Sequence, residues 1–225
     1  MELNEALRTT GAVRDFTDQA VDDAVLARVL DTARFAPSGA NAQAWRVVVI
    51  KDPDKRRRLR DSYLRGSADY LALTSAGLRP WSPTNDREAE VRALATENAV
   101  VPGGFAQHVD KAPVLLALFA DLSMLAAVDR DADRYTFAGG ASIYPFAWSI
   151  LLAARDEDLG GVITTIAIRE EPQVKELLGA PGPLALAAVI ALGYPVRQPR
   201  RLRRQPVSSF ATVDSIDGQV FGGPL

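Results

Sequence analysis

The sequence changes from a helical to a strand-like pattern across the ten residues Ala36-Pro37-Ser38-Gly39-Ala40-Asn41-Ala42-Gln43-Ala44-Trp45. Small residues let a backbone approach a flat ligand closely, and the side-chain amides of Asn41 and Gln43 each offer a hydrogen-bond donor and an acceptor. A heteroaromatic ring with amide-like edges would suit such a loop. The same residues also suit a plain helix-ending loop, in which Ser38 and Asn41 only cap and turn the chain. The ten residues alone leave both interpretations open.

Helical and strand-like patterns alternate irregularly on both sides of this loop. The predicted helices cover Asp22–Phe35, Lys55–Leu71, Asp86–Asn98, Ala141–Asp156 and Glu171–Leu178. The predicted strands cover Trp45–Ile50, Pro113–Asp121, Leu159–Ile168 and Leu184–Leu192. Because these strands are few and irregularly spaced, they argue against repeated βαβ units and favour an α+β sheet flanked by helices. No G-x-G-x-x-G motif follows the first strand, so a dinucleotide-binding fingerprint is absent.

Composition and charge narrow the class of protein. The 225 residues suit a single domain over 1–225, with a hydrophobic content of 48% and a charged content of 24% that are ordinary for a globular protein. The formal net charge of −2 gives no reason to expect nucleic acid or a membrane as a partner. The basic run Lys55–Arg58 is therefore interpreted as a solvated helix face.

The chain has few residues that do chemistry by themselves. It contains no cysteine and one histidine, His108, which excludes disulfides and thiolate nucleophiles and argues against a histidine triad or a metal site. If the protein is an enzyme, its chemistry is expected to come from a cofactor. The acidic N-terminus lacks an apolar signal core, and the apolar runs are too short to cross a bilayer, so a cytoplasmic location is expected.

Two segments have no clear place in the predicted core. Residues 72–110 are irregular and rich in proline and glycine, which is typical of a lid or insert. Trp81 and Phe105 are the candidates there for substrate contact, with simple packing under the loop as the open alternative. The tail over 197–225 is basic as far as Arg204 and then polar, so we expect it to lie across a partner subunit.

Three features could converge into one site. The first is the loop with Ser38, Asn41 and Gln43, and the second is Gly160–Thr165, where glycines allow close approach. The third is a set of arginines, the side chain that grips a phosphate with paired donors. This set comprises Arg14, Arg201, Arg203 and Arg204. A solvated basic tail is the open alternative for its C-terminal members.

Together these segments resemble the FMN-dependent nitroreductase family over nearly the whole chain. Arg14-Asp15-Phe16 is similar to the family's opening Arg-x-Phe element, and the 36–45 loop resembles its A-P-S-x-x-N-x-Q-P-W segment, with Ala44 in place of proline. Weaker matches follow in the same order as in the family, at Leu159-Gly160-Gly161, at Ala191–Pro195 and at Arg201–Pro206.

The resemblance implies a fold, a cofactor and a site. The fold is a nitroreductase-like α+β domain with a mostly antiparallel central sheet, assembled as a homodimer in which the C-terminal tail reaches across the partner. FMN lies at the dimer interface, with Arg14 and the C-terminal arginines Arg201, Arg203 and Arg204 on its phosphate. Its ribityl chain and ring are contacted by Pro37, Ser38, Gly39, Asn41 and Gln43, and the ring lies beside Ile163, Thr164 and Thr165.

Two departures from the family pattern bear on this site. The opening element often has Arg and Ser where this chain has Thr10 and Ala12. A hydrogen bond to a charged group contributes about 1.5–3 kcal/mol, so losing one cation lowers the expected FMN affinity unless Arg203 or Arg8 compensates. Asp158 stands where glycine is common before the Leu-Gly turn, which is consistent with a surface helix end.

The resemblance also implies an activity. Reduced nicotinamide passes a hydride to the flavin N5 and leaves, and a flat acceptor such as a nitroaromatic, quinone or enone then takes its place. The electron donor is NADH or NADPH, the acceptor is a small molecule, and no ionisable catalytic side chain and no metal are needed. Two alternatives stay open, namely a protein that stores FMN with little turnover and a specialised family member that uses the flavin with one dedicated substrate or consumes it.

Overall fold

The computed structural model of the chain describes residues 1–95 and 101–222. The strands are β1 (Trp45–Val49), β2 (Val114–Asp121), β3 (Gly160–Thr164) and β4 (Leu184–Gly193). The helices are α1 (Leu3–Thr9), α2 (Asp23–Ala33), α3 (Pro53–Ser75), α4 (Arg87–Ala95), α5 (Phe105–His108), α6 (Tyr144–Asp156) and α7 (Glu171–Leu178). Most predicted elements are confirmed to within a few residues. The end of the predicted helix Asp86–Asn98 lies outside the described residues.

One predicted strand is wrong over its second half. The strand expected over Leu159–Ile168 ends at Thr164, and the chain then turns through the 3-10 segment η4 (Ile166–Glu170) into α7. Alternating apolar residues hid this turn from the sequence, because Ile166 and Ile168 pack against the same core as the strand does. The turn changes the direction of Thr165 and Arg169, and both side chains are exposed.

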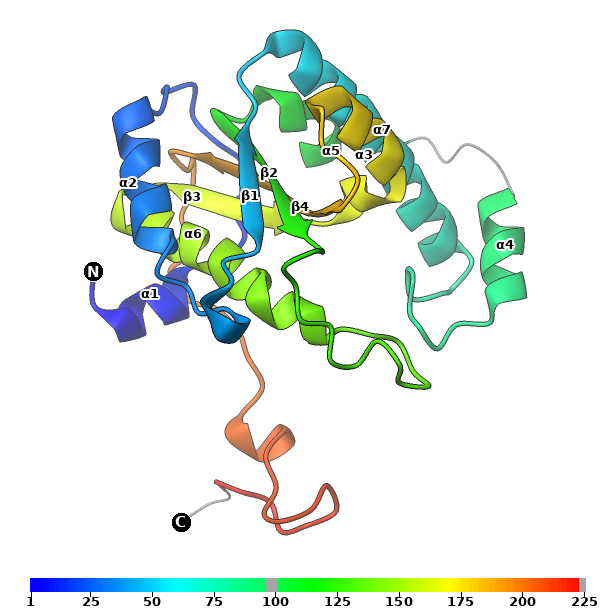
Figure 1. The fold of residues 1–225 in the computed structure, drawn as a ribbon. Helices are drawn as coiled ribbons and strands as arrows, with labels where there is room; N and C mark the ends of the chain where they lie inside the picture. The colour runs from blue at the N-terminus through cyan, green and yellow to red at the C-terminus, as the bar shows by residue number, and fades with distance from the viewer. Residues whose placement is uncertain (96–100, 223–225) are drawn as a thin grey trace.

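The sheet is antiparallel throughout, in the order β1-β2-β4-β3. Figure 1 shows α2 and α6 on one face and α3 and α7 on the other. Alternate residues of β2 supply the two cores, since Leu116 and Leu118 pack toward α2 and α6 while Leu115 and Phe119 pack toward α3 and α7. Full burial of one such side chain contributes about 1.5–3 kcal/mol, so β2 and β4 provide much of the stability of the fold.

The N-terminal segment binds to the edge of this sheet. The Val13 amide donates to the Gly161 carbonyl at 2.9 Å, and the Thr17 amide donates to Tyr194 at 2.9 Å. Between them, Phe16 forms an antiparallel bridge with Pro195. Arg14 is therefore held beside the start of β3 by backbone pairing on either side of it.

Gly161 makes this edge possible because a side chain does not fit there. A Cβ atom at this position would lie 2.7 Å from the Ala191 carbonyl oxygen and 3.0 Å from Leu151 Cδ2.

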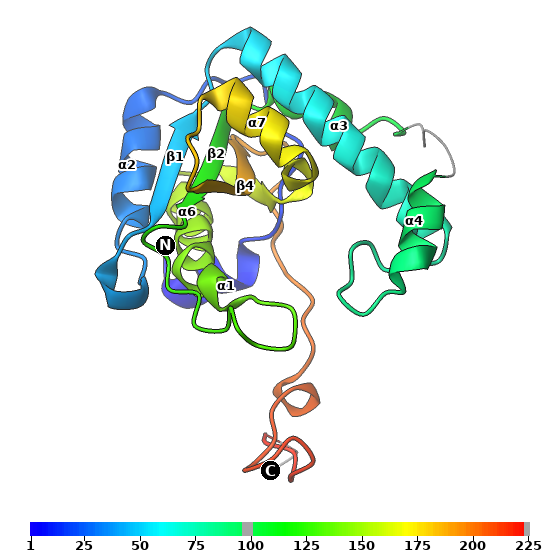
Figure 2. The same ribbon diagram turned by 45° about the vertical axis from the view of Figure 1, so that its right-hand side comes forward.

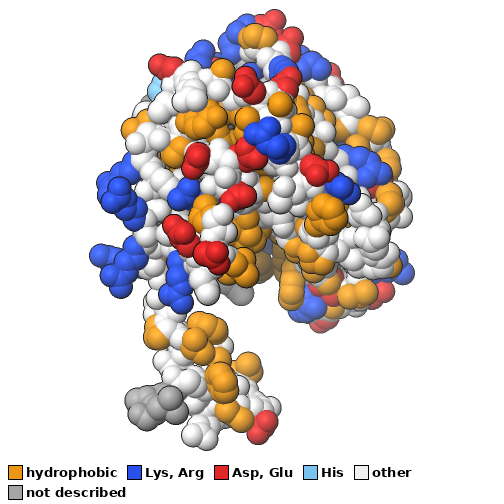
Figure 3. Space-filling view, turned by 90° about the vertical axis from the view of Figure 1, so that its left-hand side faces the viewer, with side chains coloured by type: hydrophobic (Ala, Val, Ile, Leu, Met, Phe, Trp, Pro, Cys, Tyr) orange, Lys and Arg blue, Asp and Glu red, His pale blue; other side chains and the backbone are white. Residues whose placement is uncertain are grey.

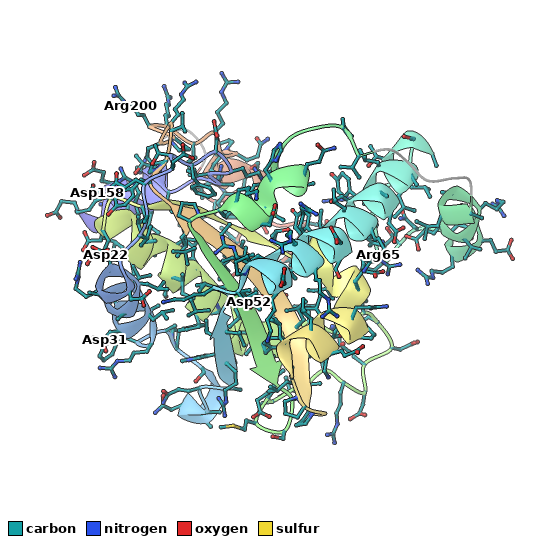
Figure 4. The ribbon with its side chains drawn as sticks, turned by 90° about the horizontal axis from the view of Figure 1, so that it is seen from above. Asp22, Asp31, Asp52, Arg65, Asp158 and Arg200 are labelled. Atoms are coloured by element: carbon teal, nitrogen blue, oxygen red, sulfur yellow. The ribbon has the colours of Figure 1, made fainter. Side chains whose placement is uncertain are left out.

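Asp158 adopts a left-handed backbone conformation, with φ of 60°, in an exposed turn. Figure 4 labels Asp158 at the periphery of the molecule, which agrees with a surface helix end and explains why glycine suits this position.

The C-terminal segment leaves the body of the protein. Figure 2 shows it extending below the sheet and helices, and a bridge between Thr212 and Val220 closes it into a small loop. Phe210 is 72% exposed and Ile216 is 92% exposed. These side chains are thus left largely exposed by the described part of a single copy, and the predicted reach across a partner stays a prediction. None of the helices in the described ranges is both long and apolar enough to cross a bilayer.

The close approach at Gly161 predicts the effect of a single methyl group. Gly161→Ala is expected to lower the free energy of unfolding by about 1–3 kcal/mol, because overpacking against backbone cannot be relieved by a rotamer change. Gly182→Ala is the matched control, since no atom lies within 4 Å of a Cβ built there. Urea denaturation of both variants measures the difference, and equal stabilities would contradict the packing described for β3.

Candidate functional site

The 36–45 loop is both a turn and a presenter of side-chain amides. Ser38 Oγ accepts from the backbone N–H of Gln43 at 3.0 Å, and the side-chain Nε2 of Gln43 donates to Asn41 Oδ1 at 3.2 Å. Ala40, Asn41 and Gln43 have φ values of 50°, 54° and 50°. Left-handed conformations at non-glycine residues cost free energy and concentrate at functional sites. The exposed amides of Asn41 and Gln43 are thus held in place by a strained loop.

This loop packs against the N-terminal end of α6. The Gly39 amide donates to Ser142 Oγ at 3.0 Å, next to the start of α6, and Trp45 stacks on Phe146 with ring centroids 4.5 Å apart. Within the described residues, no hydrogen bond or ion pair joins this loop to Arg14 or to the C-terminal arginines. The described part of one copy therefore shows no direct bond between the 36–45 loop and the predicted phosphate-binding arginines.

The predicted arginines do come from neighbouring segments. The Leu202 amide donates to the Arg8 carbonyl at 3.3 Å, and Gln198 Nε2 donates to the Thr9 carbonyl at 3.1 Å. These contacts place the C-terminal arginines next to the segment that leads into Arg14. Figure 3 shows Lys and Arg side chains gathered above the point where the tail leaves the body, and Figure 4 shows Arg200 pointing outward.

No ion pair among the described residues neutralises the charges of the predicted phosphate ligands. The ion pairs found among the described residues include none of the four predicted phosphate ligands, Arg14, Arg201, Arg203 and Arg204. Most of the other arginines in the fold face a carboxylate, as Arg28 does at 2.6 Å from Glu157. Unpaired guanidinium groups on adjoining segments suit an anionic ligand.

Thr10 lies beneath the same C-terminal segment. Its side chain is buried at 5% exposure, and its Oγ1 has no hydrogen-bond partner within the part of the chain that the structure describes. The next residue, Gly11, lies against Leu202, where a Cβ atom would be 2.8 Å from Leu202 Cδ2. A buried hydroxyl without a partner is uncommon in proteins. Thr10 thus keeps an unused donor at the position where the family often has a cation.

The end of β3 is fixed by a buried hydroxyl pair. Tyr63 Oη on α3 lies 2.9 Å from Thr164 Oγ1, and both side chains are buried. Burial raises the pKa of Tyr63, while the Thr164 hydrogen bond and the charge of Arg14 act in the opposite direction. The Val13–Gly161 hydrogen bond brings Arg14 next to the Gly160–Thr165 segment, so the structure brings the second predicted feature together with Arg14.

The two predicted substrate residues are separated by the structure. Phe105 packs edge-on against Tyr63, with ring centroids 6.0 Å apart, and contributes to the core under the loop. Trp81 instead lines a cavity of about 690 Å³ that also exposes Thr165 and Arg169. Phe105 thus packs under the loop, which was the open alternative to substrate contact. Trp81, in contrast, lines the same cavity as Thr165, a predicted cofactor-binding residue.

A buried carboxylate fixes the loop that carries Trp81. Glu90 is 2% exposed and accepts from Asn85 Nδ2 at 2.8 Å and from Arg87 Nη1 at 2.5 Å. The second Asn85 Nδ2 hydrogen bond reaches the Arg79 carbonyl at 2.7 Å. The hydrogen bond from Asn85, with the charges of Arg87 and Arg169, lowers the pKa of Glu90. Residues 79–90 therefore form an ordered wall of the cavity.

A second carboxylate orders the opposite wall. Asp129 is 8% exposed and accepts from the Phe137 amide at 2.9 Å and from Arg134 Nη1 at 2.8 Å. These hydrogen bonds, led by that of Phe137, lower the pKa of Asp129 to about 2. The loop between Asp129 and Phe137 carries Tyr135, which lines the cavity.

The sequence patterns did not point to Tyr63, Tyr144 or Arg169 as site residues. Arg169 lies four residues after Thr165, but the strand assigned as far as Ile168 hid the turn that directs it into the cavity. The basic run Lys55–Arg58 was also misinterpreted in part. Arg56 is half-buried and donates to the carbonyls of Asp110 at 2.9 Å and Ile50 at 3.2 Å, so it ties α3 to the sheet.

The antiparallel four-stranded sheet between helix pairs, with the Arg-x-Phe segment on its edge, defines a nitroreductase-like α+β protein. The sequence profile of the Nitroreductase family matches residues 7–194, and the chain belongs to that family. This confirms the predicted family and the predicted α+β fold with its antiparallel sheet, whereas the reach of the C-terminal tail across a partner stays a prediction.

Two relatives of known name align with most of this chain at 28% identity. The chain is 28% identical to iodotyrosine deiodinase 1 of Homo sapiens over 208 residues, which cover 92% of this chain and 66% of that protein, slightly less than two thirds. It is 28% identical to an NADH dehydrogenase of Thermus thermophilus over 199 residues, which cover 87% of this chain and 88% of that protein.

A solved structure shares the fold. A crystal structure of oxidized iodotyrosine deiodinase bound to FMN and 3-iodo-L-tyrosine superposes with a TM-score of 0.65 at 23% identity, covering 92% of this chain and 96% of that one. Relatives with different reactions thus share this scaffold, so the fold defines the family and the reaction has to be argued from the site.

Proposed function

We propose that the protein is an FMN-dependent oxidoreductase that transfers a hydride from NADH or NADPH to a flat organic acceptor. The observation that carries the proposal is a group of arginines without ion pairs in the described ranges, on two adjoining segments of which one pairs with β3 through the Val13–Gly161 hydrogen bond. When bound, FMN supplies the hydride chemistry, for which the chain has no side chain of its own. The family assignment and the FMN-bound deiodinase support the same cofactor.

The residues present fit the phosphate of FMN. Arg14 is held by backbone pairing on the sheet edge, and Arg201, Arg203 and Arg204 flank the segment packed on residues 8–11. Each charged hydrogen bond to the phosphate contributes about 1.5–3 kcal/mol. Thr10 adds a buried hydroxyl without a partner in the described part of the chain, but no charge. The phosphate would therefore be held mainly by the four arginines.

The ring would be held by groups that polarise and position it. Ile163 and Thr164 end β3, and the Tyr63 hydroxyl locks Thr164 in place. The exposed amides of Asn41 and Gln43 offer donors for the polar edge of a ring. Fixed donors at that edge stabilise negative charge as it develops, and the cavity next to Thr165 holds the nicotinamide and the acceptor in turn.

A second copy of the chain would complete this site. Within one copy, the 36–45 loop makes no hydrogen bond or ion pair to Arg14, Arg201, Arg203 or Arg204 in the described ranges. The tail beyond Arg204 exposes Phe210 and Ile216, which suits burial against another subunit. We therefore propose a homodimer in which one copy supplies the arginines and the other supplies Asn41 and Gln43.

A dedicated substrate is the second candidate function. It is favoured by the likeness to iodotyrosine deiodinase 1, whose name states one particular reaction on one class of substrate. The same FMN site would then be retained, while the cavity at Trp81 would accept one compound and reject general acceptors.

Reduction of the bound flavin by NADH or NADPH tests whether the protein is a nicotinamide-dependent oxidoreductase. The purified protein is expected to be yellow, and its flavin absorbance should bleach when NADH or NADPH is added without oxygen. Addition of a nitroaromatic or a quinone should then restore the colour. Bound flavin that neither nicotinamide reduces would overturn the proposed donor and leave a storage protein or a dedicated enzyme with another reductant.

Arg14→Ala is expected to weaken FMN binding by roughly ten- to hundredfold without unfolding the protein, because it removes one charged phosphate contact. Arg58→Ala is the matched control, since Arg58 is an exposed arginine of α3 that makes no ion pair within the described ranges and is not among the predicted phosphate ligands. FMN titration followed by flavin fluorescence, with circular dichroism of the apo-proteins, measures both effects. Equal affinities for the two variants would show that the phosphate is bound elsewhere.

The shared site predicts that the protein in solution has twice the mass of one chain. Removal of the residues after Gln205 is expected to shift the protein toward monomer, because it removes Phe210 and Ile216. Analytical ultracentrifugation at several concentrations measures both states. A full-length protein that sediments as a monomer while binding FMN tightly would refute the shared site.

A further inference from the structure

We propose that the cavity next to Trp81 selects an aromatic acceptor with an anionic substituent, with Arg169 binding the anion and Trp81 contacting the ring. The inference rests on the proposed function, because it takes the acceptor to be reduced at the flavin beside Thr165. It adds a class of acceptor that the fold leaves open, and it assigns specificity to two residues of this chain.

Trp81 is held in a costly conformation. Its φ of 53° is in the left-handed region, which costs an L-residue with a bulky side chain about 1–3 kcal/mol. The loop keeps this conformation because Asn85 joins the Arg79 carbonyl to the buried carboxylate of Glu90. The ring also lies 5.9 Å from Tyr70 at its centroid. Because a buried polar network maintains this backbone strain, we infer that the orientation of the Trp81 side chain has a functional role.

Arg169 is a weakly paired cation in the same wall. Its guanidinium carbon lies 5.5 Å from the Trp81 ring centroid, and its side chain is 44% exposed. Its carboxylate neighbour, Asp69, is 3.5 Å from Nε, a long single contact. The other arginine of the cavity, Arg87, is bound to Glu90 at 2.5 Å. Arg169 is thus the cation of this cavity best able to take a ligand anion.

The charged side chains of the lining are two arginines, Arg87 and Arg169, and one carboxylate, Glu90. The Trp81 Nε1 is buried and has no acceptor within the described ranges. Glu90 already accepts from two side chains, and Tyr144 Oη donates to the Ala187 carbonyl at 3.2 Å. An incoming carboxylate would therefore meet an excess of positive charge and the donors of Arg169, whereas an ammonium group would be repelled.

The cavity has the size and position for a single-ring acid. Its volume of about 690 Å³ is within the usual range for small-molecule sites. Tyr135 and Tyr144 add aromatic surface, and Thr165 connects the cavity to the end of β3. A ring against Trp81 and an anion on Arg169 would leave the opposite end of the acceptor toward β3, where the proposed flavin ring lies.

The test compares 4-nitrobenzoate with 4-nitrobenzamide, which have the same ring and nitro group but differ in charge. The FMN-loaded wild type is expected to reduce 4-nitrobenzoate with the higher kcat/KM. Arg169→Gln is expected to lower kcat/KM for 4-nitrobenzoate roughly tenfold, mainly through KM, and to change that for 4-nitrobenzamide by less than about twofold. Arg58→Gln, an exposed arginine on α3, is the matched control and should change neither value.

A binding measurement separates this inference from the proposed electron donor. Calorimetric titration of the FMN-loaded protein with 4-nitrobenzoate and with 4-nitrobenzamide needs no nicotinamide. Preference for the acid that is lost in Arg169→Gln supports the inference even where neither NADH nor NADPH reduces the flavin. Equal effects of Arg169→Gln on both compounds, or no wild-type preference for the acid, would overturn it.

Discussion

The site depends on the pairing of residues 12–17 with the edge of the sheet. The amide of Val13 reaches Gly161, that of Thr17 reaches Tyr194, and the segment between them has no freedom to move away. The pairing needs two glycines, because side chains at Gly160 and Gly161 would collide with Val13 and with β4. A backbone contact at the sheet edge thus decides where Arg14 lies, and with it the anion-binding side of the proposed cofactor site.

Around this fixed edge, the cavity is shaped by two loops that lack regular structure. Each loop is organised by one nearly buried carboxylate, Glu90 in one wall and Asp129 in the other. Both accept from an arginine and from a second donor, which offsets the cost of burying a charge. A loop held in this way can carry an aromatic side chain into a cavity as reliably as a helix does. This explains how an irregular segment could determine specificity on a regular scaffold.

The sequence predicted the layers of the fold well because its strands and helices carry strong apolar patterns. The buried run over β2 and the apolar α6 leave little choice of structure, and the Arg-x-Phe element with the 36–45 loop identifies the family. The bend after Thr164 was missed because its isoleucines continue the alternation of the strand. The pocket role of Arg169 and the burial of Arg56 follow from long-range contacts, which a local pattern does not contain.

Local strain at Ala40, Asn41, Gln43 and Trp81 has a consequence for how this protein can change over evolution. Four left-handed residues other than glycine, at about 1–3 kcal/mol each, represent a large part of the 5–15 kcal/mol by which a typical domain is stable. The well-packed sheet has to supply that margin. Substitutions that weaken β2 or β4 would therefore leave less stability to offset the strain of these loops, and a more stable sheet could accept more varied loops.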